Sequence, residues 1–231
     1  MERKREFLGI WLLLASFCLL AAVSLLSWRL AASNIPEIVG RTLTEEERAE
    51  VIARNSPLTD YVYLSGNADF PREGEIEKIT IHHMADNIPL ERLGEVFAEP
   101  DRRASSNYAV DTGGRVALYV EESNRAWTSS SPENDHRAVT IEVANDQIGG
   151  DWHVSDASYD ALIRLCVDIC RRNGIRELVY TGDASGSLTI HKMFSETTEC
   201  PGPYLESRMP DIAEEVSHCL AVERESAGEE G

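Results

Sequence analysis

The sequence predicts a mixed α/β domain of the α+β kind, with a central mixed β-sheet flanked by helices, and a transmembrane helix ahead of it. Three observations lead to this prediction. An apolar run without charges stands near the N-terminus, and stretches with strand-like alternation and with helical periodicity then follow one another. Because the two kinds of stretch are mixed along one segment, we expect one sheet with helices packed against it.

The apolar run covers residues 7–28 and contains no charged residue. As a helix it would be about 33 Å long, enough to cross a hydrocarbon core of about 30 Å. Basic residues at positions 3–5 favour a cytoplasmic location for residues 1–6, so we expect a single-pass protein of the cell membrane with its domain outside. The alternative is secretion after signal cleavage near residue 34, but the apolar region of signal peptides is usually only about 7–15 residues long.

Residues 29–75 are predicted to form an extracellular connector. Its one helical signal begins at Thr44, a candidate N-cap, and Glu47 three residues later completes a capping box. Proline and glycine then interrupt regular structure at Pro57, Gly66, Pro71 and Gly74. At the other end of the chain, residues 219–231 are predicted to form an acidic disordered tail.

The charge balance excludes one class of partner. The chain has 40 acidic and 22 basic residues, a formal net charge of −18. Nucleic-acid phosphates require a basic surface, so we expect no nucleic-acid partner. Attraction to anionic lipids or anionic wall polymers is disfavoured for the same reason. We expect a monomer that reaches the membrane only through its N-terminal helix.

The domain itself is predicted over residues 76–218. Five stretches alternate or concentrate β-branched and aromatic residues and are predicted strands: residues 79–82, 107–110, 115–120, 138–144 and 178–181. A Gly-Gly pair between the second and third stretches predicts a hairpin. Two stretches carry apolar residues at helical spacing and are predicted helices: residues 90–99 and 156–173.

Three residues stand out as candidate metal ligands. His82 ends the first predicted strand of the domain, and His191 precedes Cys200 by nine positions. Two imidazoles and one thiolate are suitable ligands for zinc, and three protein ligands leave a fourth position for water, as in catalytic zinc sites. The spacing alone is weak, because an unrelated His and Cys at this separation are common.

Glu142 is a candidate catalytic group. In the segment 138–144, alternation puts Val139, Ile141 and Val143 on one face of the strand and Glu142 on the other. A carboxylate within a largely apolar strand is costly to bury without a partner. It therefore lies on an exposed face, belongs to a salt bridge, or is a general base facing a metal-bound water.

Five segments of the chain together resemble a known family: ITIHHMA, ASSNYAVDTGGRV, NRAWTSSS, AVTIEVAND and IHKMFSETTECPGPYL. Over about residues 60–210 they are similar to the zinc-dependent N-acetylmuramoyl-L-alanine amidases, which include phage lysozyme-type amidases and animal peptidoglycan recognition proteins. The bacterial and prophage branch, with a TIEVAN-type strand, is the most similar. The resemblance implies an amidase-like fold, Zn²⁺ as cofactor, and cleavage of the amide between N-acetylmuramic acid and L-alanine in peptidoglycan.

The resemblance also implies roles for single residues. His82, His191 and Cys200 stand at the positions of the three zinc ligands. Glu142 stands at the position of the catalytic glutamate, and Thr198 stands at a further active-site position two residues before the last ligand. Members of this fold that lack the third ligand bind peptidoglycan without cutting it. The presence of Cys200 and Glu142 favours an enzyme, with a non-catalytic recognition protein as the alternative.

Other positions near these motifs are less decisive. Ser106 stands where some phage members carry a tyrosine, so a tyrosine-dependent mechanism is disfavoured. Asn107 and Trp127 are candidates to line the substrate groove, although Trp127 fits the core equally well. His83 follows a ligand along a strand and should point to the opposite face, which favours a hydrogen-bonded core histidine over a fourth ligand.

Overall fold

The computed structural model describes residues 35–228, and residues from Ile38 onward form one compact unit. The predicted cytoplasmic residues 1–6 and transmembrane helix at 7–28 lie outside the described residues. Among the helices within 35–228, none is long and apolar enough to cross a membrane.

A six-stranded mixed sheet forms the centre of the unit, with the strand order β1-β5-β4-β7-β3-β8. The strands of this sheet are β1 (Thr59–Val62), β3 (Lys78–His83), β4 (Tyr108–Val110), β5 (Val116–Leu118), β7 (Ala138–Val143) and β8 (Leu188–Ile190). Strands β4 and β5 pair antiparallel as the predicted hairpin, and all other neighbours in the sheet are parallel. Two short strands, β2 (Ala68–Asp69) and β6 (Arg125–Ala126), form a separate antiparallel pair.

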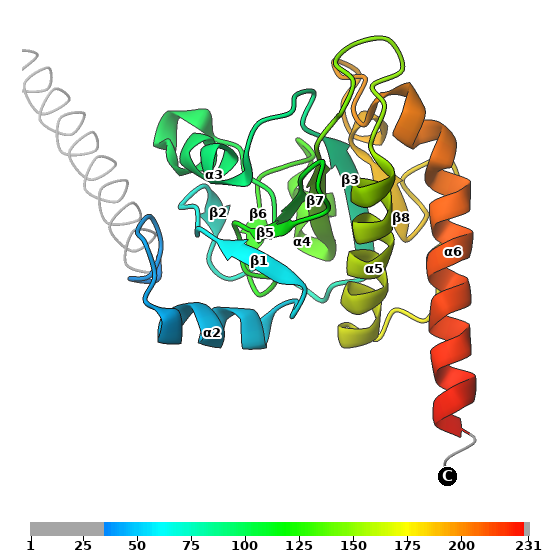
Figure 1. Ribbon diagram of the computed structural model, residues 1–231, viewed down its shortest axis with the longest axis horizontal. Coiled ribbons are helices and arrows are strands. Elements are labelled where there is room, and N and C mark those ends of the chain that lie inside the picture. The colour runs from blue at the N-terminus through cyan, green and yellow to red at the C-terminus, as the bar shows by residue number, and fades with distance from the viewer. Residues whose placement is uncertain (1–34, 229–231) are drawn as a thin grey trace, which may run out of the picture. The chain divides into compact units, whose positions relative to one another are not determined.

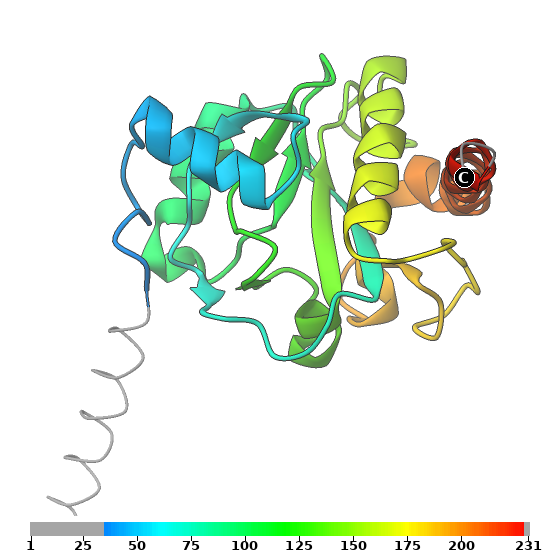
Figure 2. The ribbon, with the colours of Figure 1, turned by 90° about the horizontal axis from the view of Figure 1, so that it is seen from below.

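Helices cover both faces of the sheet. The α-helices are α2 (Glu45–Arg54), α3 (Leu90–Ala98), α4 (Pro132–Arg137), α5 (Asp156–Arg172) and α6 (Gly202–Gly228), and the 3-10 turns are η1 (Pro100–Arg102) and η2 (His191–Met193). Both ribbon views place α5 and α6 side by side on one side of the sheet, with α3 on the other side (Figures 1 and 2). The predicted layered architecture of a mixed sheet flanked by helices is confirmed.

The main core lies between the sheet and the helices α5 and α6. Val139, Ile141 and Val143 of β7 are fully buried there, against residues such as Leu165 of α5 and Ile212 of α6. Each such side chain contributes roughly 1.5–3 kcal/mol of burial free energy. The opposite face is covered over β4 and β5 by the apolar side of α3. Over β7 and β3, the same face of the sheet carries the polar side chains of the candidate metal centre.

Three sequence predictions differ from the structure: the connector, one strand and the C-terminal tail. The predicted connector is part of the compact unit from residue 38, because β1 joins the sheet and Val51 of α2 is 1% exposed. The predicted strand at 178–181 is wrong: the edge strand is β8, and residues 178–181 only contact it. The tail predicted from residue 219 is helical to residue 228, because Leu220 extends the apolar face of α6 into the core.

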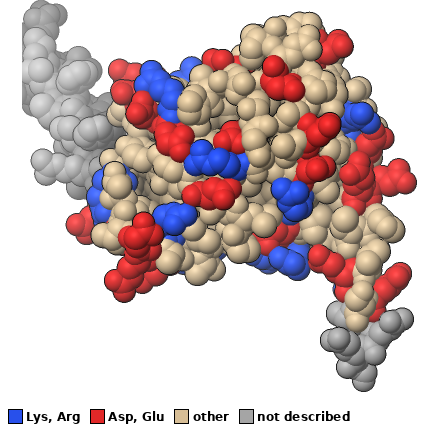
Figure 3. Space-filling model, viewed as in Figure 1, with Lys and Arg blue, Asp and Glu red and all other residues tan. Residues whose placement is uncertain are grey.

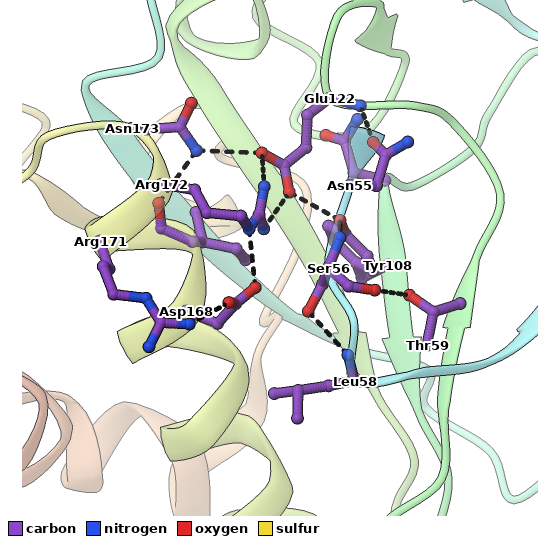
Figure 4. Close-up of polar contacts among 12 residues, drawn as sticks. Asn55, Ser56, Leu58, Thr59, Tyr108, Glu122, Asp168, Arg171, Arg172 and Asn173 are labelled. Carbon is purple, nitrogen blue, oxygen red and sulfur yellow. Dashed lines mark hydrogen bonds and ion pairs between the residues drawn. The ribbon is translucent and has the colours of Figure 1, made fainter. Parts of the chain in front are cut away.

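The helix before β1 is attached to the sheet by a buried polar network around Glu122 (Figure 4). The Glu122 carboxylate accepts hydrogen bonds from the Tyr108 hydroxyl at 2.6 Å and from Arg172 and Asn173 at the end of α5. The Glu122 backbone N–H donates to the side chain of Asn55, just after α2. Tyr108 is fully buried in this network, so the structure gives this tyrosine a place in the core and no access to substrate.

The surface agrees with the acidic composition. On the face shown in Figure 3, acidic side chains are spread over the whole view and basic side chains lie between them. Elsewhere among the described residues, surface ion pairs join the two kinds of side chain, as between Arg92 and Glu95 and between Arg115 and Glu91. Such exposed pairs contribute little to stability, typically below about 1 kcal/mol. The interspersed pattern on this face offers no continuous basic surface for a polyanion.

Candidate metal centre

The candidate site lies at the carboxyl ends of the two central parallel strands. His82 of β3 pairs in register with Glu142 of β7, so both side chains leave the same face of the sheet. Ala109 of β4 is the register partner of Glu142 on its other side. The carboxylate therefore stands between an imidazole and a small apolar residue.

The other two candidate ligands arrive from the loop after β8. Because β8 pairs parallel with β3, His191, which follows β8 directly, comes beside His82, and the two ring centroids are 4.8 Å apart. The far end of the loop is closed by a hydrogen bond from the Lys192 backbone N–H to the Cys200 carbonyl, at 3.1 Å. The Cys200 Sγ atom lies 3.6 Å from Nδ1 of His82. One ligand atom from each of His82, His191 and Cys200 lies within 4.8 Å of the others.

The chemistry of this cluster fits a zinc ion. His82 is 1% exposed, and burial together with the two nearby imidazoles lowers its pKa, so its ring is neutral and has a lone pair to give. Burial also lowers the pKa of His191. Burial and the Glu142 carboxylate raise the pKa of the Cys200 thiol, while a hydrogen bond from the His83 backbone N–H, at 3.4 Å, favours the thiolate. Two neutral imidazoles and a thiol convertible to thiolate are a donor set that zinc prefers.

Glu142 has the properties of a proton-transfer group. Its side chain is partly exposed, but the Oε2 atom is buried and has no hydrogen-bond partner. Burial raises the pKa of this carboxyl to about 8, and the positive charge of Arg102 opposes the shift only in part. A carboxyl whose pKa lies near neutral pH can both accept and return a proton.

The remaining predicted site residues fall into two groups. Thr198 lies in the ligand loop, where its hydroxyl accepts a hydrogen bond from the Cys200 backbone N–H at 3.1 Å. Trp127 is half-buried and lines a cavity of about 220 Å³ together with Ser130. Ser130 contacts His191, so this cavity adjoins the metal centre.

Asn107 is fully buried, and its amide is bonded to Val120 and Thr140 within the sheet. It has no surface for a substrate, and we correct its predicted role to a structural one.

His83 does not belong to the cluster of ligand atoms. Its ring packs edge-on against Trp152, with the ring centroids 5.2 Å apart. Alternation along β3 separates it from His82 and places it outside the metal centre. Its ring is half-buried and Nδ1 has no hydrogen-bond partner, so the predicted hydrogen-bonded core position is not shown.

The contact between the loop at residues 128–131 and His191 is not predicted from the sequence. The Ser130 Oγ atom lies 3.4 Å from Nε2 of His191, and the buried carboxylate of Asp135 holds the backbone of this loop. The run of hydroxyl residues at 128–131 ahead of Pro132 reads as the start of a helix. Ser131 does cap α4, which hides the second role of the loop.

Two imidazoles, a cysteine and a carboxyl with one buried oxygen meet at the carboxyl ends of β3, β7 and β8, which is consistent with a metal-dependent hydrolase. The sequence model of the N-acetylmuramoyl-L-alanine amidase family matches residues 72–203, more than half of the chain, and the protein belongs to this family. It is accordingly a peptidoglycan hydrolase with N-acetylmuramoyl-L-alanine amidase activity.

Solved structures agree on the fold. The chain is similar to PlyL at 15% sequence identity, with a TM-score of 0.50, over 78% of this chain and 97% of PlyL. It is also similar to a mutant endolysin from Bacillus subtilis at 14% identity, with a TM-score of 0.50, over 68% of this chain and 99% of the endolysin. No curated protein matches the chain.

Proposed function

We propose that the chain cleaves the amide between N-acetylmuramic acid and L-alanine with a zinc ion held by His82, His191 and Cys200, and with Glu142 moving the proton. The observation that carries this proposal is the register pairing of His82 with Glu142. It sets a carboxyl with a raised pKa directly beside a candidate ligand, on the same face of the sheet. Membership of the family supports the reaction, and the cluster of three ligand atoms supports the metal.

The metal, Glu142 and Thr198 have different roles in the proposed reaction. Zinc, when bound, supplies a Lewis acid that lowers the pKa of water and polarises the scissile carbonyl. Glu142 takes the proton from the attacking water and returns it to the leaving nitrogen, because an amide nitrogen leaves poorly as an anion. The Thr198 hydroxyl accepts one hydrogen bond from the Cys200 N–H, so its own hydrogen is available to donate to a developing oxyanion.

The substrate would reach the centre along the cavity beside His191. The residues that line this cavity include Trp127, Ser130 and Arg103. An indole offers a flat apolar surface with a polar edge, which suits sugar and peptide groups. Peptidoglycan is accordingly the partner we propose, with Trp127 retained as a substrate contact.

The rival function is a recognition protein of the same fold that binds peptidoglycan without cutting it. Such a recognition protein would lack the third metal ligand. Here the third ligand position is filled by Cys200, and its backbone is fixed by two hydrogen bonds, so the ligand set favours an enzyme.

Two measurements test the proposal. Metal analysis of a soluble form, residues 34–231, should give one zinc per chain, and the double variant His191→Ala with Cys200→Ser should lose it. Mass spectrometry of purified peptidoglycan digested with the same protein should show stem peptides with a free amine on alanine. Full zinc content in the double variant would exclude the proposed ligands, and intact amide bonds with zinc bound would favour the recognition protein.

We further propose that the protein is anchored in the cell membrane by residues 7–28, with residues 1–6 in the cytoplasm and the amidase unit outside. The charge-free apolar run and the basic residues before it support this topology. Protease added to intact cells should remove the amidase unit. Release of a protein with its N-terminus near residue 34 into the medium would support signal cleavage instead.

A further inference from the structure

A loop outside the predicted ligand set contacts the metal centre. The Ser130 Oγ atom lies 3.4 Å from Nε2 of His191. The two histidine ligands differ in this respect, because Nε2 of His82 is buried without a hydrogen-bond partner. His82 is fixed by the packing around its strand, whereas His191 is half-buried at the start of a loop. His191 is therefore the ligand whose ring orientation depends on an external partner.

Ser130 reaches His191 through an unusual backbone conformation. Its φ is +64°, in the left-handed region that residues with a side chain seldom adopt. Glycine is the residue that this conformation favours, and a serine there is less stable. Strained residues of this kind persist where the surrounding structure holds them, and they cluster at functional sites. The position retains a hydroxyl despite the strain.

Asp135 holds the loop in place. Its carboxylate is 2% exposed and accepts hydrogen bonds from the backbone N–H groups of Thr128, at 3.0 Å, and Ser129, at 3.1 Å. Within residues 35–228 Asp135 forms no direct ion pair, although the positive charges of Arg125 and Arg72 act on its carboxylate. Burying a carboxylate without a direct ion pair is costly. The two backbone hydrogen bonds offset part of this cost, and they fix the loop to Asp135.

We propose that Ser130, positioned by Asp135, is the outer-sphere partner of the metal ligand His191: the His191 Nε2–H donates to the Ser130 hydroxyl, and Nδ1 faces the metal. Metal-bound histidines generally donate their second ring N–H to an acceptor, which fixes the tautomer and the ring orientation. The inference rests on the proposed zinc centre and adds two positioning residues to it. Asp135 acts through the backbone at 128–130, which its carboxylate holds by hydrogen bonds to the N–H groups of Thr128 and Ser129.

The decisive variant is Ser130→Gly. It removes the hydroxyl and relieves the strained φ, so the metal-free protein should melt at the same temperature or higher. Zinc affinity, measured by competition with a chromophoric chelator, should nevertheless fall by about 10- to 100-fold. The matched control is Ser131→Ala, which removes the N-cap of α4 without touching His191. It should lower the melting temperature and leave zinc affinity unchanged.

Asp135→Asn tests whether Asp135 positions Ser130. If Asp135 acts through Ser130, the double variant with Ser130→Gly should bind zinc no more weakly than the weaker single variant. In the zinc-loaded wild type, nitrogen-15 NMR should show a protonated Nε2 on His191. Zinc affinity within twofold of wild type in Ser130→Gly, or a deprotonated His191 Nε2, would overturn the inference. A wild type that binds no zinc would instead overturn the proposed function, so the two failures are distinguishable.

Discussion

Glu142 and His82 are register partners on adjacent parallel strands, and both side chains leave the face of the sheet opposite the α5–α6 core. The pairing fixes the distance between the proton-transfer group and the first ligand by the spacing of the strands themselves. Sites built on strands are held more rigidly than sites built on loops. The loop residues His191 and Cys200 complete the centre around this fixed pair.

Glu142→Gln should remove proton transfer while leaving the site assembled. The amide keeps the size of the side chain but cannot act as a base. General acid–base groups typically contribute about 10²–10⁴-fold, so turnover should fall by that factor with zinc content unchanged. Rate, zinc content and melting temperature measured on one preparation check this. Turnover within about threefold of wild type would remove Glu142 from the mechanism.

The raised pKa of Glu142 also predicts how the stability of the metal-free protein depends on pH. Burial raises the pKa of this carboxyl to about 8 from an ordinary value near 4.5. The folded state therefore binds this proton more tightly than the unfolded state does. The resulting contribution to folding stability is fully present below about pH 4.5 and is lost as pH rises through about 8.

Wild type should consequently lose stability relative to Glu142→Gln across this window, by at most a few kcal/mol at ~1.36 kcal/mol per pKa unit. Melting temperatures of the two metal-free proteins between pH 4 and 9 provide the measurement. A difference between them that stays constant with pH would contradict the raised pKa.

Zinc uptake should release protons from two groups. Burial raises the pKa of the Cys200 thiol, so the metal-free protein holds this proton at pH 7, and Glu142 holds its own. A divalent cation favours both ionised forms. Calorimetric titration with zinc in two buffers of different ionisation enthalpy counts the protons. Glu142→Gln should release about one proton fewer than wild type, and an equal count would mean that Glu142 is already ionised.

Much of this arrangement could be predicted from the sequence. Alternation in β7 places Glu142 opposite Val139 and Ile141, and the capping box at Thr44 and Glu47 forms as predicted. These features are local, and short-range periodicity determines them. The resemblance to a family indicated the three ligands, whose distance from each other along the chain gives no local signal.

The errors concern tertiary contacts. Asn107 lies within one of the family-like segments and is predicted from the sequence to line the groove, yet its amide forms hydrogen bonds within the sheet. Residues 29–75 are predicted from the sequence to be a connector because prolines and glycines interrupt them, although β1 lies within this stretch and completes the sheet edge. The role of Asp135 depends on a fold that brings residue 135 beside residue 191. No spacing rule in the sequence predicts such a contact.

The last prediction concerns Gly202, which follows the ligand Cys200 closely and begins α6. Its φ is +83°, and a Cβ atom there would lie 2.9 Å from Cβ of Trp152 and 3.2 Å from the His83 ring. Gly202→Ala should therefore combine backbone strain with a steric clash that neither neighbour can relieve easily. Gly174, after α5, is a matched control, because its φ is +71° but a Cβ atom would meet nothing within 4 Å.

Gly174→Ala should cost about 1–2 kcal/mol, the penalty of the left-handed conformation alone. Gly202→Ala should cost more than this, and it should also weaken zinc binding, because the clash displaces the backbone that carries Cys200. Chemical denaturation and chelator competition on both variants separate the two effects. Equal losses of stability, with zinc affinity unchanged in both variants, would show that the ligand loop is independent of the packing of Gly202 against Trp152.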